Sequence, residues 1–268
     1  MTPINRRTFL KTSLTASAAA TLGAGSQVRA SEPAGDGEYI ELRAYRLKPG
    51  ASRALLDSYL QHALIPALNL RGVAAVGAFT ETEPKDGPAV WVLIPHPSLQ
   101  ALATAAAALN ADPAVQAAGS AYLSGPTKEL PAFDRIDSWC FLPFSGLPRL
   151  VVPRLAREGK PRIFEMRTYE SYSELKALKK VAMFNAGEIK LMQDLDLSPV
   201  FYGQALVGRD LPQLTYMLCS PDMETHKRNW SAFGSHPTWV ALKNDPQYAD
   251  TVSKITSRFM VPAAYSQI

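Results

Sequence analysis

The chain has 268 residues, with 28 Lys and Arg against 24 Asp and Glu, which gives a formal net charge of +4 and a sequence pI of about 9.0. Residues 1–30 hold four basic residues and no acidic one, so the remaining 238 residues carry 24 of each sign. This balance argues against a nucleic-acid partner, and a composition of 47% hydrophobic and 19% charged residues excludes a disordered or fibrous protein. No apolar run is long enough to predict a membrane-spanning helix.

An export signal is predicted at the start of the chain. Arg6 and Arg7 precede a moderately apolar segment over residues 12–25, and small residues follow up to Ala30. A charged start, an apolar middle and a small-residue end make a signal peptide, and the paired arginines before Thr-Phe-Leu-Lys resemble the twin-arginine signal. We expect residues 1–30 to be cleaved near Ala30 and the mature chain to reach a bacterial periplasm. The alternative is an amphipathic N-terminal helix that stays attached.

An internal repeat divides the rest of the chain. The segment Glu41–Tyr45 (ELRAY) matches Glu165–Tyr169 (EMRTY), 124 residues further on. Similar separations recur at other positions, which indicates a gene duplication. The repeat predicts a first unit over residues 38–145, a linker over 146–161 that is rich in proline and basic residues, and a second unit over 162–268.

Each unit shows the same order of predicted elements. Apolar periodicity in the first unit predicts a strand, a long helix, two strands, a helix and a strand, over residues 39–47, 51–70, 73–82, 89–95, 97–110 and 133–142. The second unit repeats this order over residues 163–170, 174–195, 198–207, 214–219, 222–235 and 251–261. Ser98 and Asp222 stand where helix N-caps are expected.

The order β-α-β-β-α-β is that of the ferredoxin-like fold, in the α+β class. Such a unit has helices on one face of a four-stranded antiparallel sheet, and the other face must be covered or wetted. We therefore predict two tandem ferredoxin-like units that pack sheet to sheet as a pseudo-dimeric α/β barrel.

The opening strand of each unit carries charges on one face. Side chains alternate between faces along a strand, so one face groups Glu41, Arg43 and Tyr45 in the first unit and its counterpart groups Glu165, Arg167 and Tyr169. We expect the apolar faces to meet the helices and these polar faces to point between the two sheets. They are interpreted either as the polar floor of a ligand pocket, with an arginine that recognises an anion, or as a structural salt-bridge lattice.

Other candidate residues are more scattered. His62 lies in the first long helix, and Asn185 and Glu188 share one face of the equivalent helix, where a base near an arginine would suit acid–base chemistry. We expect His96 to be exposed in a turn and His226 to lie on a solvated helix face. Cys140 and Cys219 are expected to be buried thiols, with a disulfide as the alternative. No spacing predicts a metal site, a phosphate loop or a serine-hydrolase elbow.

The second unit resembles the NIPSNAP family. The resemblance rests on several segments that together span almost the whole unit and include Tyr202: Phe164–Tyr169, Phe184–Glu188, Ser198–Gly203, Leu211–Leu218, Trp230–Phe233, Asp245–Asp250 and Tyr265–Ile268. The first unit resembles a diverged copy that keeps Glu41, Arg43 and Tyr45. The resemblance implies tandem dimeric α/β-barrel units, and it implies no settled activity or set of catalytic residues.

These observations favour a periplasmic protein that binds a small organic molecule between its two sheets. One alternative, by analogy of fold, is an oxygenase that is cofactor-independent or uses haem, with His62 as the only helix histidine considered as an axial ligand. The other is a non-catalytic module that self-associates into homo-oligomers. The sequence names no cofactor and no ligand.

Overall fold

The computed structural model describes residues 37–48 and 52–268, and its elements occur in the same order twice. The first set is β1 (Tyr39–Arg46), α1 (Ala54–Tyr59), η2 (Leu60–Leu64), α2 (Ile65–Leu70), β2 (Gly77–Glu81), β3 (Ala89–His96), α3 (Leu99–Asn110), α4 (Pro113–Ala118), α5 (Ser120–Leu123) and β4 (Arg135–Pro143). After α6 (Arg154–Arg157) come β5 (Ile163–Glu170), α7 (Glu174–Met183), η3 (Phe184–Glu188), α8 (Ile189–Asp194), β6 (Pro199–Val207), β7 (Gln213–Ser220), α9 (Met223–Ser235), α10 (Pro237–Asn244), η4 (Pro246–Tyr248) and β8 (Lys254–Pro262).

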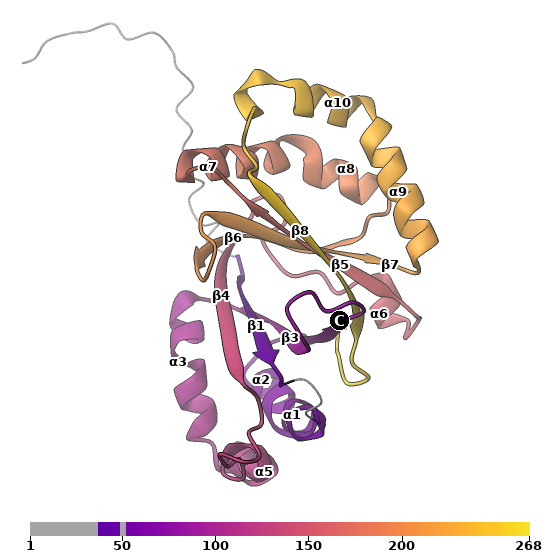
Figure 1. The fold of residues 1–268 in the computed structure, drawn as a ribbon. Helices are drawn as coiled ribbons and strands as arrows, with labels where there is room; N and C mark the ends of the chain where they lie inside the picture. Colours follow the sequence, from indigo (N-terminus) through magenta and orange to yellow (C-terminus); the bar gives the residue numbers. More distant parts are fainter. Residues whose placement is uncertain (1–36, 49–51) are drawn as a thin grey trace, which may run out of the picture.

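The eight strands close into one antiparallel barrel in the order β1-β3-β2-β8-β5-β7-β6-β4. Each half supplies four neighbouring strands, and the halves join where β2 pairs with β8 and where β6 pairs with β4. Closure leaves no unpaired sheet edge in the barrel. Helices of the first half cover one side of the barrel and those of the second half cover the other (Figure 1). The predicted α+β class and the pseudo-dimeric α/β barrel are confirmed.

The helices begin and bend at residues with a local cause. Ser98 and Asp222 accept hydrogen bonds from the backbone N–H of Ala101 and Thr225, as the predicted caps require. Each long helix contains one π-helical turn, η2 in the first half and η3 in the second, and the two turns start 124 residues apart. A π turn inserts one residue into an α-helix. The duplication therefore preserves an irregularity that the apolar periodicity did not reveal.

The start of β2 is later than the sequence predicts. The predicted strand covers residues 73–82, whereas β2 begins at Gly77. The chain before and at this point is bonded to the C-terminal tail: Val76 N–H donates to the Gln267 side chain, and Ala78 N–H donates to Ser266 Oγ. A tail 188–191 residues away thus takes the place of a strand neighbour, which local sequence cannot show.

Apolar side chains fill the middle of the barrel and one of its ends. Phe79, Phe164, Phe201 and Met217 belong to one buried cluster that contains residues of both halves. The C-terminal Ile268 is part of this cluster, and linker residues Leu150, Val152 and Leu155 pack against it. The linker and the tail therefore close the end of the barrel at which β1 and β5 begin.

The faces of the opening strands are the reverse of those predicted. Leu42 and Met166 lie in the barrel interior, whereas Tyr45 packs with helix residues such as Leu56 and Tyr59. The prediction was wrong because it assumed that only an apolar face can meet the helices. The interior is packed with large apolar side chains, and the helix side offers polar partners for each charge.

Both cysteines are free thiols: Cys219 is buried and Cys140 is half-buried. Among the residues that the structure describes, no helix is long and apolar enough to cross a membrane. The predicted signal peptide, residues 1–30, lies outside the described part.

Gly203 is expected to be intolerant of a side chain. A Cβ atom there would lie 2.5 Å from Cβ of Phe141 in the barrel core, where it cannot move aside freely. We expect Gly203→Ala to lower the free energy of unfolding by about 1–3 kcal/mol in urea denaturation. Gly234, in α9, has open space around it, so Gly234→Ala should raise that energy by about 0.4–1 kcal/mol. Equal effects of the two changes would contradict the tight packing at Gly203.

Candidate functional site

The predicted polar residues of the first strand form a network between the sheet and the helices. Arg43 donates from Nη2 to Glu41 Oε2 at 3.0 Å and from Nη1 to the Tyr45 hydroxyl at 3.3 Å. His96 Nε2 lies 3.0 Å from Glu41 Oε2, and Ser138 Oγ donates to Glu41 Oε1. His96 is buried, so its expected exposure was wrong. Its side chain lies on the same face of the sheet as Glu41 and is hydrogen-bonded to that carboxylate.

The second unit repeats this network with one substitution. Arg167 Nη1 donates to Glu165 Oε1 at 2.8 Å, and Ser257 Oγ donates to the same oxygen. The histidine comes from α9 instead of a strand: His226 Nε2 lies 2.9 Å from Glu165 Oε2. Nδ1 of His226 contacts Ser220, which stands at the position of His96 in the first unit. The solvated position expected for His226 was therefore also wrong.

Both carboxylates are held in their charged form. Burial alone would raise the pKa of Glu41, but the His96 hydrogen bond and the Arg43 charge outweigh it and lower the pKa to about 2. Burial acts in the same direction at Glu165, and the His226 hydrogen bond, the Arg167 charge and the Ser257 hydrogen bond lower that pKa to about 2 as well. These groups are thus anchored by several partners each, which supports the interpretation as a salt-bridge lattice.

The remaining predicted residues make separate contacts and form no common site. His62 is exposed on the outside of its helix, with Nδ1 3.1 Å from the Ser58 carbonyl. Asn185 accepts a hydrogen bond from Gly146 N–H and so fastens the linker. Glu188 is buried against Lys180 at 2.8 Å, and burial raises its pKa despite that partner. The Tyr202 hydroxyl donates to Met192 Sδ inside the second helix–sheet layer.

The structure has instead a cavity at the open end of the barrel, where β1 and β5 end. Its volume is about 470 Å³. None of the ten predicted site residues lines it. The lining comes mainly from inward-facing strand positions and from the loops over residues 82–88 and 208–212: Leu42, Arg46, Lys85, Asp86, Trp91, Trp139, Phe141, Met166, Thr168, Glu170, Arg209, Asp210, Gln213, Thr215, Lys254, Ile255, Thr256 and Arg258.

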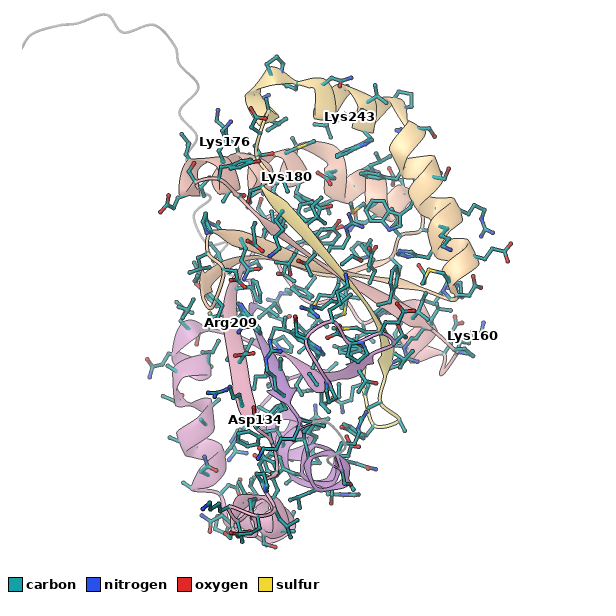
Figure 2. The ribbon with its side chains drawn as sticks, viewed as in Figure 1. Asp134, Lys160, Lys176, Lys180, Arg209 and Lys243 are labelled. Atoms are coloured by element: carbon teal, nitrogen blue, oxygen red, sulfur yellow. The ribbon has the colours of Figure 1, made fainter. Side chains whose placement is uncertain are left out.

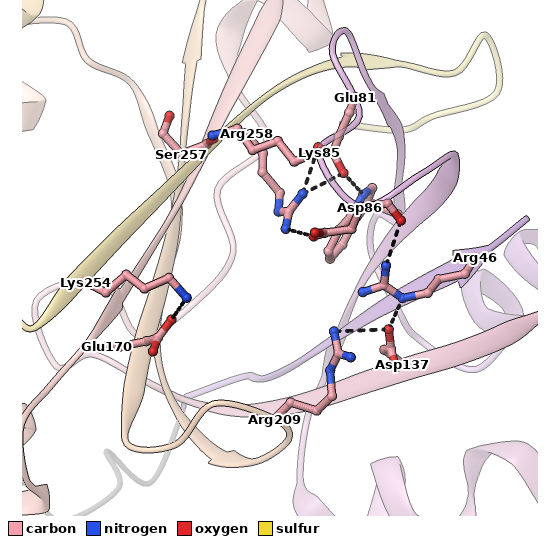
Figure 3. Close-up of polar contacts among 11 residues, drawn as sticks. Arg46, Glu81, Lys85, Asp86, Asp137, Glu170, Arg209, Lys254, Ser257 and Arg258 are labelled. Atoms are coloured by element: carbon pink, nitrogen blue, oxygen red, sulfur yellow. Dashed lines mark hydrogen bonds and ion pairs between the residues drawn. The ribbon is translucent and has the colours of Figure 1, made fainter.

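A network of ion pairs borders the mouth of this cavity (Figure 3). Arg258 pairs with Glu81 at 2.9 Å and with Asp86, and Arg46 donates to the Asp86 carbonyl. Asp137 is shared by Arg46 and Arg209. The network connects strands and loops of both halves, and Figure 2 shows Arg209 where the two halves meet.

Two indole rings form one wall of the cavity. Trp91 and Trp139 stack with ring centroids 5.9 Å apart and planes inclined by 20°. Arg258 lies over the Trp91 ring and Arg209 over the Trp139 ring, at 5.3 and 5.8 Å, which is within the range of cation–π contacts. Gly208 has φ of +145°, and a Cβ atom there would lie 2.0 Å from the Trp139 ring. Only glycine lets the loop over residues 208–212 lie against this indole.

Sequence reasoning missed the cavity because it assigned the wrong strand face to the interior. Arg46 and Glu170 continue the faces of Leu42 and Met166. A charged residue at the end of an otherwise apolar face was the available signal, since the end of a barrel strand reaches solvent. The tryptophans carry no motif, and only the strand register brings them together.

The cavity offers few ligands for a metal or haem. Among the residues that the structure describes, no group of His, Cys, Asp and Glu side chains has the geometry of a metal site. Haem iron in proteins is held by His, Cys, Met or Tyr, and of these only Met166 is in the lining. The chemistry of this site therefore consists of apolar contact, hydrogen bonding and charge.

Residues 164–267 match the NIPSNAP family model, so the second half of the chain is a NIPSNAP domain. Residues 3–23, outside the described part, match the model of the twin-arginine translocation (TAT) pathway signal sequence, which indicates export across a membrane. Both matches confirm predictions made from the sequence. Comparison with curated proteins finds no match.

Solved structures with the same architecture include two provisionally named monooxygenases. The protein from Fusobacterium nucleatum has a TM-score of 0.53 at 8% identity and covers 85% of this chain and 93% of its own. The protein from Lactobacillus acidophilus has a TM-score of 0.52 at 6% identity and covers 85% and 94%. A NIPSNAP family protein of unknown function from Agrobacterium tumefaciens covers 40% and 92% at 15% identity, with a TM-score of 0.36. At these identities the first two show a common fold alone.

The buried carboxylates predict how stability depends on acid. Their pKa is about 2 in the folded protein against 4.5 for a free glutamate, so they stabilise the fold above about pH 4.5, and that contribution is lost as the pH falls towards 2. In Glu165→Gln, the slope of unfolding free energy against pH in this window should be smaller by up to ~1.4 kcal/mol per pH unit, one proton's worth.

The measurement is urea denaturation at several pH values between 2 and 6. Asp194→Asn, which removes the partner of Lys190 in an exposed pair, is the control and should change the unfolding free energy by less than ~0.5 kcal/mol. An unchanged acid slope in Glu165→Gln would show that Glu165 does not have the lowered pKa.

Proposed function

We propose that this NIPSNAP-domain protein binds a small organic molecule in the open end of its barrel. One observation carries the proposal: an otherwise filled barrel keeps a cavity of about 470 Å³ at one end. Ligand sites in proteins have volumes of about 300–1,000 Å³ and combine apolar walls with a few polar groups. The indoles of Trp91 and Trp139, the hydroxyls of Thr168 and Thr256, and a charged mouth provide that combination.

The export signal gives the compartment of this function. A protein carried by the twin-arginine pathway folds before it crosses the membrane. We propose that the chain acts in the periplasm after cleavage near Ala30, so the ligand is a molecule of that compartment or one taken up in the cytoplasm and carried across.

Binding fits the site better than the enzymatic alternative. His62 lies on the outer surface of its helix, so it cannot serve as an axial ligand in the cavity. The lining contains no His, Cys, Tyr or Ser side chain, and two of its three carboxylates, Asp86 and Glu170, are held in ion pairs with Arg258 and Lys254. Only the shared fold connects this chain with the activity in the names of the Fusobacterium and Lactobacillus proteins. No residue of the cavity gives further support for that activity.

The self-association alternative also lacks a specific feature. One chain supplies both halves of the barrel, and every strand has two neighbours within the described residues. Formation of this barrel therefore needs no second copy, and the sheet offers no edge on which another chain would pair.

The test is native mass spectrometry of the protein isolated from the periplasm, followed by identification of the released small molecule. We expect one organic molecule per chain. Thr256→Phe, a change at a half-buried lining position, should abolish its retention because the larger side chain fills part of the cavity, and Thr256→Val should retain it. Circular dichroism and the melting temperature show that both variants fold.

Two results would contradict the proposal. One is retention of the molecule by folded Thr256→Phe at the level of the unchanged protein. The other is an isolated protein that carries no small molecule and whose melting temperature is unaffected by a panel of organic compounds.

A further inference from the structure

The duplication is broken at the cavity. On the helix side, Glu, Arg and Tyr occur at equivalent positions of both opening strands. Inside the barrel, strand register places Thr215 where the first half has Trp91, and Arg258 where it has Trp139. The first half therefore supplies an aromatic wall, and the second half faces it with hydroxyl, amide and guanidinium groups.

The aromatic wall consists of two stacked indoles, with Arg258 over one and Arg209 over the other. Trp91 and Trp139 are nearly parallel, and both are more than nine-tenths buried. An indole pair of this kind gives most contact to a flat ring system, because aromatic rings attract one another in offset-stacked or edge-to-face arrangements. A saturated ring of equal size touches such a wall with fewer atoms.

The opposite wall is polar and its groups are held in place. The Thr168 and Thr215 hydroxyls are 2.9 Å apart, and Thr215 donates to the Gln213 side chain, which in turn donates to the Arg209 carbonyl. These bonds fix the direction of each group before a ligand arrives. These groups are already hydrogen-bonded to one another, and their remaining oxygen lone pairs can accept hydrogen bonds from a ligand.

Arg258 is the cation between the two walls, and its two carboxylate partners differ. Glu81 is almost completely buried and also accepts from the Trp91 indole N–H, so it is fixed. Asp86 lies on the loop between β2 and β3, and its side chain is 52% exposed. A carboxylate on such a loop can be displaced from the arginine, whereas Glu81 cannot.

Resting on the function proposed above, we propose that the ligand is a planar aromatic carboxylic acid, whose ring lies on the indole wall and whose carboxylate takes the place of Asp86 on Arg258. Arginine binds carboxylates through two parallel N–H groups, which fits the exchange of one carboxylate for another. The lining contains five cationic and three anionic side chains, and Glu81 and Asp137 beside it balance the charge, so an anion binds at Arg258 by displacing Asp86.

Three probes of similar size separate the parts of this proposal: 2-naphthoate, the neutral 2-naphthamide, and decalin-2-carboxylate, which keeps the acid and loses the aromatic rings. Isothermal titration calorimetry gives the affinity of each after the protein has been refolded free of bound molecules. We expect 2-naphthoate to bind at least about tenfold more tightly than either of the other two.

Two variants that remove one negative charge each test the exchange at Arg258. Asp86→Asn removes the competing carboxylate and should raise the affinity for 2-naphthoate by about threefold to tenfold, with little change for 2-naphthamide. Asp210→Asn is the matched control: Asp210 lies in the same lining, and its side chain makes no ion pair among the described residues. It should raise the affinity for 2-naphthoate by less than about twofold.

Equal affinity for 2-naphthoate and 2-naphthamide, equal affinity for 2-naphthoate and the decalin acid, or equal effects of Asp86→Asn and Asp210→Asn would overturn the proposal. If no probe binds but the native protein still releases another kind of molecule on mass spectrometry, the aromatic acid is wrong and the binding function stands. If the native protein also carries nothing and responds to no compound, both fail.

Discussion

The rest of the structure depends on the two lateral pairings that join the halves of the chain, β2 with β8 and β6 with β4. They consume the outer strands of two four-stranded sheets and enclose a space between them. Once the barrel is closed, each strand has a face towards that space and a face towards the helices, and β3 and β7 are buried on both. A charged side chain buried on either face then needs a partner, since an unpaired buried charge is strongly destabilising.

The Glu-x-Arg-x-Tyr motif is a consequence of this constraint. It places a carboxylate and a guanidinium on the helix side, and both units complete the arrangement with a histidine and a serine. The histidine comes from β3 in the first unit and from α9 in the second. Histidines at two different sequence positions therefore bind equivalent carboxylates. Ser220 stands at the position that His96 has in the first unit. The agreement between the units indicates that the packing of charge, rather than the position of one residue, has been kept.

Much of the fold could be predicted from the sequence, because each unit carries local signals that agree with one another. The repeat, the period-two strands and the caps at Ser98 and Asp222 placed most elements within a few residues. The shortened β2 was missed because Gln267 and Ser266 reach it from the other end of the chain. The candidate site was missed for a related reason. Periodicity tells which residues share a strand face, but it does not tell which face is inside when both are buried, and His96 and His226 gave no local sign of their burial.

A single chain can place different residues on the opposite walls of its barrel, whereas a symmetric pair of chains cannot. In a homodimeric barrel, any residue on the cavity wall is repeated on the opposite wall, so indoles would face indoles. Here both halves belong to one sequence, and interior positions differ between them: Trp91 and Trp139 face Thr215 and Arg258, whereas both opening strands keep Glu, Arg and Tyr on the helix side. One wall is therefore aromatic and the other polar, a difference that a symmetric pair of chains cannot have. Such a difference is expected when the two walls contact different parts of one asymmetric molecule.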